Sequence, residues 1–373
     1  SAYAWILEKD QYWDYLEEML PKPPKVFWWL IIGFTGLIVI GKVTYEYDRA
    51  LLRRGWQHLM VQTAPLPSNT IYDLHLRSNG DMMIATAQGA ALWHVSEGSP
   101  WGEDSLVYNR QNSGIGDDHV RAVYEDRQGN LWFGTESGLS CLCKGEWKQI
   151  PEAGLSEQVG KVRSFVEDTK DNLWIGTLNG LFMWNGSQLI SYSQTVNFLP
   201  DLYIFAIAHQ IVHDEEYLWL GTQKGVTRLK LSAQTMDSWD FSSRDLGWGG
   251  VSHLIVDTQN RVWITTIGGG IGRWDDKEWT FYRLGSSNLP TSVVNSIIEQ
   301  PGKGFWLGHG FPTEPGGLVS RFDGVDEWTI YRQNNSGFNG GEPMAFAFDP
   351  IGRLWIGTAI DGLQIYDPAL AKR

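Results

Sequence analysis

The sequence predicts an all-β fold, a seven-bladed β-propeller closed by an N-terminal strand and preceded by an amphipathic helix and one transmembrane helix. Three observations support this prediction. A unit of about 45 residues recurs seven times, glycine (42 residues) and tryptophan (20 residues) are abundant, and one long apolar run lies near the N-terminus. Glycine and aromatic residues suit short strands joined by tight turns better than they suit helices.

The repeated unit centres on the pattern Leu-Trp-x-Gly-Thr, followed three residues later by glycine, as in LWIGTLNGL at 173–181. The threonine position is occupied in order by Thr86, Thr135, Thr177, Thr222, Thr266, His309 and Thr358. Successive positions are 42 to 49 residues apart. A period of roughly 40–50 residues is typical of propellers, whose blades repeat around an axis.

Each unit has room for four antiparallel strands. An apolar first strand such as VRAVYED (120–126) leads into a polar turn, whose Asp and Gly residues favour a tight hairpin. The Leu-Trp-x-Gly-Thr strand, a glycine turn and a third strand follow. An outer strand such as EWTFYR (278–283) completes the unit.

We expect the repeated Trp and Gly residues to be structural. The glycine lets backbones approach closely where blades converge, and the tryptophan fills the wedge between neighbouring blades. Recurrence at one register in six copies favours this role over a ligand cage, and Met83 takes the position in the first copy. These signature residues are Trp132, Gly134, Trp174, Gly176, Trp219, Gly221, Trp263, Trp306, Gly308, Trp355 and Gly357, and Thr265 replaces the glycine in the fifth copy.

The two ends of the repeat region predict how the ring closes. The seventh unit contains three strands before Arg373, whereas residues 56–62 resemble a fourth strand without the first three. Trp56 and Pro67 have the same spacing as Trp279 and Pro290 in a complete unit. We therefore expect residues 56–62 to complete the last blade, so that the domain spans 56–373.

Closure in this way also assigns the faces of the ring. The chain should enter the ring at the face carrying the first-to-second turns, with Lys372 and Arg373 on the same side. The turn at 309–317 should lie on the opposite face, away from the bilayer.

Residues 26–44 are expected to form a transmembrane helix. Val26 to Gly41 is sixteen residues without a charge, and Trp28 and Trp29 stand where interfacial aromatics belong. The expected anchor residues are Trp28, Trp29, Gly33, Gly36 and Lys42. A buried core helix or a signal peptide is the alternative, but the acidic and aromatic segment before the run is atypical of a signal peptide.

The flanking segments suggest a partner and, weakly, an orientation. Residues 1–25 predict an acidic amphipathic helix ended by a proline-rich turn, which suits a neighbouring subunit better than anionic lipid. Residues 45–55 form a short linker. Three Lys or Arg residues precede the span and four follow it, so the charge bias favours a cytoplasmic propeller of a bacterial inner membrane.

Composition excludes some classes of function and constrains the cysteines. The formal net charge of −13 argues against nucleic-acid binding, which needs a basic surface. Cys141 and Cys143 would point to one face of a strand, so we expect them to be reduced, which also favours the cytoplasmic side. Two thiols alone do not make a zinc site.

No catalytic motif stands out, and we expect neither a cofactor nor a metal. His209 and His213 are a weak hint of a metal site because a third ligand is missing. The best interaction candidate is the enlarged turn with His309, Phe311, Thr313 and Glu314, since insertions in repeats often mark the binding face. A neutral surface insertion is equally compatible with it.

The Leu-Trp-x-Gly-Thr-x-x-Gly unit, with its Glu-Trp-Thr-x-Tyr outer strand, resembles the two-component-regulator propeller repeat over about residues 56–366. The resemblance implies the propeller fold and the ligand-sensing parts of hybrid histidine kinases, although no kinase, receiver or DNA-binding segment is present. A propeller lyase is a more distant resemblance.

We therefore expect a non-enzymatic, single-pass membrane protein whose propeller is a protein-docking platform, an accessory subunit of a membrane complex. Its expected partners are membrane lipid and other subunits, contacted through the N-terminal helices. The alternatives are an extracytoplasmic ligand-sensing propeller that reports to a separate protein, and a propeller lyase or hydrolase.

Overall fold

A computed structural model describes residues 54–95, 100–150, 159–195, 199–241, 250–310 and 316–371. The chain divides into two units, Ser1–Arg53 and Arg54–Arg373, and all described residues belong to the second. The expected amphipathic helix and the expected anchor, with Trp28, Trp29, Gly33, Gly36 and Lys42, lie outside the described residues. Within those residues, no helix has the length and apolar character needed to cross a membrane.

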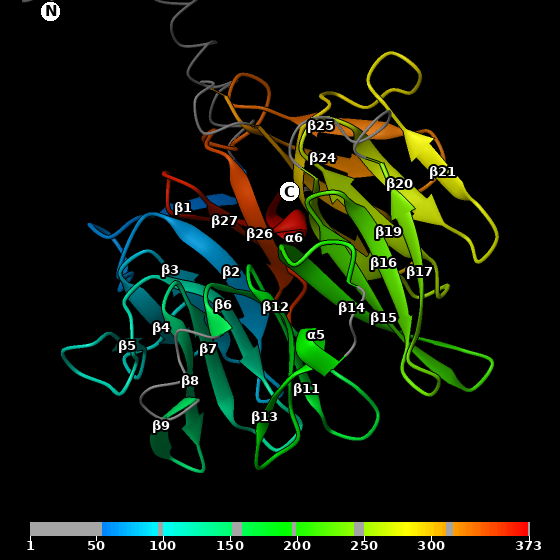
Figure 1. The fold of residues 1–373 in the computed structure, drawn as a ribbon. Coiled ribbons are helices and arrows are strands. Elements are labelled where there is room, and N and C mark those ends of the chain that lie inside the picture. The colour runs from blue at the N-terminus through cyan, green and yellow to red at the C-terminus, as the bar shows by residue number, and fades with distance from the viewer. Residues whose placement is uncertain are drawn as a thin grey trace, which may run out of the picture. The chain divides into compact units, whose positions relative to one another are not determined.

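Seven four-stranded antiparallel sheets form the blades of a propeller in the described part of the chain (Figure 1). Blade 1 contains β2 (Ile71–Leu76), β3 (Met82–Thr86), β4 (Gly89–Trp93) and β5 (Leu106–Tyr108). Blade 2 contains β6 (Val120–Glu125), β7 (Leu131–Thr135), β8 (Gly138–Cys143) and β9 (Glu146–Ile150). Blade 3 contains β10 (Val162–Glu167), β11 (Leu173–Thr177), β12 (Gly180–Trp184) and β13 (Leu189–Ser191), followed by the short helix α5 (Tyr192–Thr195).

The remaining blades repeat this order. Blade 4 contains β14 (Ile204–Val212), β15 (Glu215–Thr222), β16 (Gly225–Lys230) and β17 (Thr235–Asp240). Blade 5 contains β18 (Val251–Val256), β19 (Val262–Thr266), β20 (Gly270–Trp274) and β21 (Trp279–Tyr282). Blade 6 contains β22 (Val294–Gln300), β23 (Gly304–His309), β24 (Leu318–Phe322) and β25 (Trp328–Tyr331). Blade 7 contains β26 (Pro343–Phe348), β27 (Leu354–Thr358), β28 (Leu363–Tyr366) and β1 (Trp56–Leu59), and α6 (Pro368–Ala371) follows β28.

The first strands of the blades form the inner wall of the ring. Each first strand contacts the first strand of the next blade, and β26 contacts β2, so the circle is closed. The prediction of an all-β, seven-bladed propeller is therefore confirmed.

The tryptophan that recurs in six of the seven repeats is the wedge between neighbouring blades, as predicted. Trp132 of blade 2 is buried against Val162 and Ile175 of blade 3, and Trp219 of blade 4 is buried against Val251 of blade 5. Six of these tryptophans are 0–3% exposed, and Met83 fills the same place between blades 1 and 2. Burial of an aromatic side chain of this size is a large apolar contribution at every interface.

The glycine two residues after the wedge tryptophan leaves room for the next blade to approach closely. A Cβ atom at Gly221 would lie 2.6 Å from Cγ1 of Val251, and one at Gly357 would lie 2.5 Å from Cγ2 of Ile71. Val251 and Ile71 both begin the first strand of the following blade. Any side chain at these glycines would therefore force adjacent blades apart.

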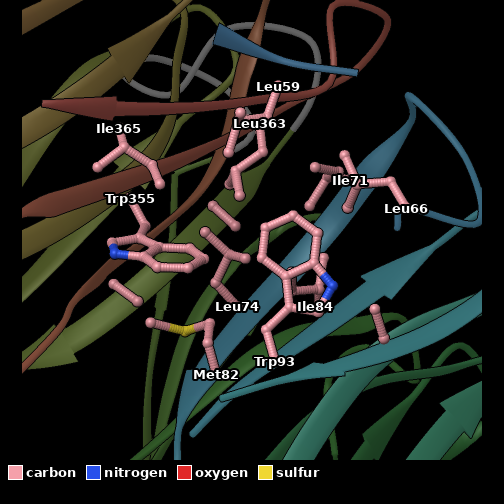
Figure 2. Close-up of a cluster of buried hydrophobic side chains, with 13 residues drawn as sticks. Leu59, Leu66, Ile71, Leu74, Met82, Ile84, Trp93, Trp355, Leu363 and Ile365 are labelled. Carbon is pink, nitrogen blue, oxygen red and sulfur yellow. The ribbon is translucent and has the colours of Figure 1, made fainter. Parts of the chain in front are cut away.

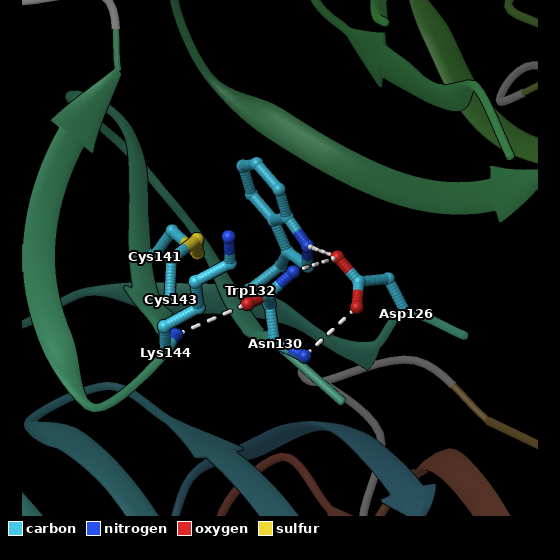
Figure 3. Close-up of a disulfide and its surroundings, with 6 residues drawn as sticks. All are labelled: Asp126, Asn130, Trp132, Cys141, Cys143 and Lys144. Carbon is cyan, nitrogen blue, oxygen red and sulfur yellow. Dashed lines mark hydrogen bonds between the residues drawn. A yellow bond between two sulfur atoms is a disulfide. The ribbon is translucent and has the colours of Figure 1, made fainter. Parts of the chain in front are cut away.

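An aspartate or glutamine of the same blade accepts a hydrogen bond from the indole N–H of each wedge tryptophan. Nε1 of Trp132 donates to Oδ2 of Asp126 at 2.8 Å, and the same carboxylate accepts a bond from the Asn130 side chain (Figure 3). Asp168, Asp257 and Asp349 bond Trp174, Trp263 and Trp355 in the same way, while Gln210 and Gln300 serve Trp219 and Trp306. A buried N–H without a partner costs about 1–3 kcal/mol. Burial of the tryptophan therefore depends on the side chain that accepts this hydrogen bond.

Strand β1 closes the ring, as its sequence predicts. It pairs antiparallel with β28 from Trp56↔Tyr366 to Leu59↔Leu363. Leu59 joins side chains of blade 7 and blade 1, including Trp355 and Trp93, in one buried cluster (Figure 2). Strand pairing and apolar burial therefore both hold the N-terminal strand in the last blade.

The register also places the ends of the described chain on one face. Gly55 accepts a hydrogen bond from Asp367, so residues 54–56 lie beside the start of α6. In blade 7 this end of the sheet carries the first-to-second turn, and Leu59 lies at the other end with the second-to-third turn. His309 and Leu318, which bound the enlarged turn, lie at that other end in blade 6. The predicted assignment of faces agrees with the described residues, while the position of a membrane is outside them.

The expectation of reduced cysteines is wrong. Cys141 and Cys143 form a disulfide within β8, with their Cα atoms 5.4 Å apart (Figure 3). A regular strand would separate them by roughly 6.6 Å, but Cys143 ends the strand just before Lys144 and Gly145, which both have positive φ. The local contraction brings the pair into the usual disulfide range. The thiol argument for a cytoplasmic propeller is therefore lost.

Closure of the ring should depend on Trp56. Its ring lies 4.7 Å from that of Tyr366 and 5.9 Å from those of Tyr331 and Phe338. We expect Trp56→Ala to lower the free energy of unfolding by about 3 kcal/mol, measured by urea denaturation. The control Val61→Ala changes a side chain that is 40% exposed and should cost at most about 0.5 kcal/mol. Equal denaturation midpoints for the two variants would contradict the closure argument.

Candidate functional site: the bulge ring and central cavity

Every first strand carries a β-bulge at its second residue. In β10, Val162 pairs with Thr177 and Ser164 pairs with Gly176, so the residue between them is extra. The same shift occurs in all seven first strands of the described propeller. A bulge re-aims a side chain out of the regular alternation of the strand. The seven bulged residues, here called the bulge ring, are Tyr72, Arg121, Arg163, Phe205, Ser252, Asn295 and Met344.

The side chains of the bulge ring differ from blade to blade. The residue before each bulge is always apolar and buried: Ile71, Val120, Val162, Ile204, Val251, Val294 and Pro343. Each bulged residue is half-buried, and the set includes two cations, two aromatic residues, two polar residues and one methionine. The buried residue before the bulge thus keeps its apolar character in all seven blades, while the bulged residue changes its chemistry.

All seven bulged residues line one central cavity of about 670 Å³. The bulges lie where the first strands begin, which is the face that also carries the second-to-third turns. The cavity has the volume of a small-ligand or peptide site, which is usually about 300–1,000 Å³. It is the candidate site because it collects one half-buried bulged residue from every blade.

One side of the cavity is basic. The carboxylate of Glu136, in the second-to-third turn of blade 2, is held by three cations. Its Oε1 accepts from Nε of Arg121 at 2.5 Å and from Nη1 of Arg163 at 3.1 Å, and its Oε2 is 2.8 Å from Nζ of Lys161. Burial would raise the pKa of Glu136, but these three partners outweigh it and hold the pKa at about 2. The cluster therefore keeps a net charge of +2 at neutral pH.

Tyr72 extends this basic side. The guanidinium of Arg121 lies 3.8 Å from the centre of the Tyr72 ring, a cation–π contact that fixes its orientation. Tyr72, Arg121 and Arg163 come from blades 1, 2 and 3, so they are consecutive around the ring.

The opposite side contains an acid that is short of partners. Glu342, just before β26, is 7% exposed and accepts a hydrogen bond from Asn295 at 2.9 Å through Oε1. Its buried Oε2 has no hydrogen-bond partner among the described residues. Burial raises the pKa of Glu342 to about 7, against the lowering effect of Asn295. Its charge therefore changes near neutral pH.

Two ionisable side chains deeper in the cavity are hydrogen-bonded to the backbone of the inner strands. The carboxylate of Asp73 accepts from the backbone N–H groups of Val123 and Leu74, and burial raises its pKa to about 6. His253 accepts from the N–H of Ile297 in the next blade, and burial lowers its pKa to about 4. These two residues occupy equivalent positions and tie one inner strand to the next.

The predicted interaction loop is only partly described. His309 is fully buried and bonds Oγ of Ser320 at 2.7 Å, and burial lowers its pKa to about 3. It is therefore not an exposed contact residue, because it occupies the buried threonine position of the repeat. Phe311, Thr313 and Glu314 lie outside the described residues. The base of the turn is held by Asn295, which donates to the carbonyl of Gly310 at 2.8 Å.

The two histidines considered for a metal do not share a site. His209 in β14 bonds Glu216 at 2.8 Å, whereas His213 lies beyond the strand in a turn with φ of 50°. The described residues contain no group of three or more side chains arranged to hold a metal.

A second depression, of about 1,060 Å³, lies between blades 2 and 3. It is lined by turn residues such as Asp126, Asn130 and Asp171, which already bond the wedge tryptophan or neighbouring turns. It is larger than the central cavity, but its polar groups serve the scaffold.

Sequence analysis missed the bulge ring. A bulge depends on the pairing of two strands and leaves no local signal in either one. In an alignment of the seven first strands the second residue varies, but the third, fifth and sixth residues vary as well, so the sequence does not single out the bulge.

Comparison with known families supports the repeat assignment. Residues 114–137 and 156–179 match the family model described as Two component regulator propeller. These segments contain the first two strands of blades 2 and 3. Two of the seven repeats therefore match the two-component regulator propeller family. The resemblance deduced from the sequence is thereby confirmed.

Solved structures share the propeller fold. The extracellular domain of a hybrid two component system from B. thetaiotaomicron has a TM-score of 0.67 and 19% identity, covering 84% of this chain and 42% of that chain. This propeller thus spans less than half the length of that structure. A streptogramin B lyase has a TM-score of 0.62 and 13% identity, covering 84% and 97%. YCF48 bound to D1 peptide has a TM-score of 0.58 and 12% identity, covering 84% and 94%.

At these identities the likeness is one of fold alone, and a shared fold does not imply a shared function. No curated protein matches the chain significantly in sequence. The function of this propeller must therefore be argued from its own site.

The raised pKa of Glu342 predicts a specific pH dependence. The folded protein holds this proton up to about pH 7, whereas the unfolded chain releases it near 4.5. The stability that protonation contributes is thus fully present below about pH 4.5 and is lost as the pH rises to about 7. We expect Glu342→Gln, which can still accept from Asn295, to gain stability relative to the parent from pH 5 to pH 8. Denaturation at several pH values measures this difference, and a difference independent of pH would contradict it.

Proposed function

We propose that this chain is a non-enzymatic recognition module whose propeller docks a partner protein at the bulge ring. The observation that carries the proposal is the convergence of seven half-buried bulged residues, one from each blade, on one cavity. The set combines two cations with aromatic, polar and thioether side chains, the kind of mixed lining that ligand sites use.

Binding accounts for the cavity better than catalysis does. The ionisable groups nearest the scaffold are bonded to it: Asp73 and His253 accept backbone N–H groups, and Glu136 is held by three cations. A general base needs a pKa near the working pH and access to a substrate proton. Glu342 meets the first condition. It accepts its hydrogen bond from Asn295, however, and no second catalytic group contacts it among the described residues.

We propose further that residues 26–44 anchor the module in a membrane as an accessory subunit, with residues 1–25 contacting neighbouring subunits. The placement of Gly55 supports this arrangement. The chain joins the ring at the face opposite the bulge ring, so attachment there leaves the recognition face open.

The side of the membrane is proposed to be extracytoplasmic. The charge bias toward the cytoplasm was a difference of one basic residue and finds no support. The Cys141–Cys143 disulfide favours an oxidising compartment, and the B. thetaiotaomicron structures are of extracellular domains.

A ligand-sensing propeller that reports to a separate protein is the second candidate. The repeat match and the B. thetaiotaomicron likeness favour it. Both candidates use the same cavity, and they differ in whether its occupant is part of a protein.

Site-specific photocrosslinking tests the docking proposal. A photoreactive residue at Phe205 or Met344, on opposite arcs of the bulge ring, should crosslink a defined partner in cells that express the full chain. The matched control is Val325, which is 74% exposed on the outer part of blade 6. Crosslinks of equal yield from position 325, or a lack of crosslinks from 205 and 344, would refute docking at the ring.

Thiol labelling tests the proposed side. The sequence contains two cysteines, and both are in the disulfide, so the parent provides a low background. We expect Val325→Cys to react with a membrane-impermeant maleimide added to intact cells, with the parent as the control. Labelling that appears only after the cells are lysed would place the propeller in the cytoplasm.

A further inference from the structure

The charged groups of the cavity are unevenly distributed around the ring. Both arginines of the bulge ring come from adjacent blades, with Lys161 beside them. Glu136 neutralises one of these three charges and leaves two. The neighbouring ring residues are aromatic: Tyr72 on one side and Phe205 on the other.

The two guanidinium groups have donors to spare. Among the described residues, Arg121 bonds only through Nε and Arg163 only through Nη1, and both bonds go to Oε1 of Glu136. A guanidinium offers five N–H donors in a planar fork. Their side chains are 28% and 18% exposed, so the remaining donors reach the cavity.

We infer that Arg121 and Arg163 bind a carboxylate group of the ligand, presented beside an apolar or aromatic group that packs on Phe205 and Tyr72. The inference rests on the proposed function and specifies the chemistry of the docked partner: an acidic side chain or chain terminus next to an apolar residue. Arginine forks suit planar carboxylates, and the stacked Tyr72 fixes the orientation of one fork.

A carboxylate matches these donors in shape, because its two coplanar oxygens can face the planar fork of one guanidinium. Glu136 occupies one donor of each arginine and leaves the cluster with a net charge of +2, so the remaining donors attract an anion.

The probe for this test is benzoate, with neutral benzamide as its isostere and phenylphosphonate as the phosphate-like anion. The ε-methyl resonance of Met344, a cavity residue assigned with Met344→Leu, reports binding to the full chain at constant ionic strength. We expect saturable shifts with benzoate and at least about tenfold weaker binding of benzamide. Equal affinity for benzoate and benzamide, or tighter binding of phenylphosphonate, would overturn the inference.

Substitutions assign the effect to the two arginines. Arg121→Gln and Arg163→Gln should each weaken benzoate binding at least about tenfold. The control is Arg228→Gln: Arg228 is also 18% exposed and bonds Asp237 and Asp276, but it lies outside the cavity. An equal loss in the Arg228 variant would overturn the inference.

A second pair of variants leaves the Glu136 cluster intact in case the arginine variants unfold. Phe205→Glu places a competing carboxylate next to Arg163 in the ring and should abolish benzoate binding, whereas Phe205→Gln should retain it within about threefold. Equal affinities in these two variants would contradict the inference. Crosslinking from Met344 would still succeed in that case, so failure of the carboxylate chemistry is distinguishable from failure of docking.

Discussion

The structure depends on one interaction repeated around the ring: a wedge tryptophan is buried between blades, and its N–H is bonded to an aspartate or glutamine side chain of the same blade. The apolar part of the indole fills the gap that opens as neighbouring blades splay outward. The polar part would be costly to bury alone, and the carboxylate of residues such as Asp126 removes that cost. The same carboxylate organises the hairpin through Asn130, so turn, strand and interface are coupled in a single unit.

This coupling determines where the propeller is free to vary. The second strand is fixed by its tryptophan (Met83 in blade 1) and, in five blades, by the glycine on which the first strand of the next blade packs. The bulged residues lie at the start of the first strands and converge on one cavity. Recognition is therefore concentrated there.

The sequence predicted the fold because its signals are local and repeated. Period, turn chemistry and the isolated strand at Trp56 were enough to derive seven blades and their closure. The candidate site was not predicted, since a bulge is a property of paired strands. The interaction loop was assigned from its length alone, and His309 proved to be the buried equivalent of the repeat's threonine. The cysteines were misjudged because the strand was assumed to stay regular up to its last residue.

Departures from the repeat in other blades explain why spare hydrogen-bond donors lie on the basic side of the cavity. In blade 5, Thr265 replaces the glycine, and its buried hydroxyl lies 2.9 Å from Oγ of Ser252. Ser252 also bonds the carbonyl of Val294, so this member of the bulge ring serves the scaffold. Asn295 of blade 6 is similarly committed to the base of the enlarged turn and to Glu342. The ring residues of blades 1 to 3 also link neighbouring blades, because Arg121 stacks on Tyr72 and Arg163 bonds Glu136 of blade 2. The two arginines nevertheless keep N–H donors that bond no other described residue. Positive charge and spare hydrogen-bond donors therefore lie together on the side of the cavity formed by blades 1 to 3, and this is where a partner can be recognised.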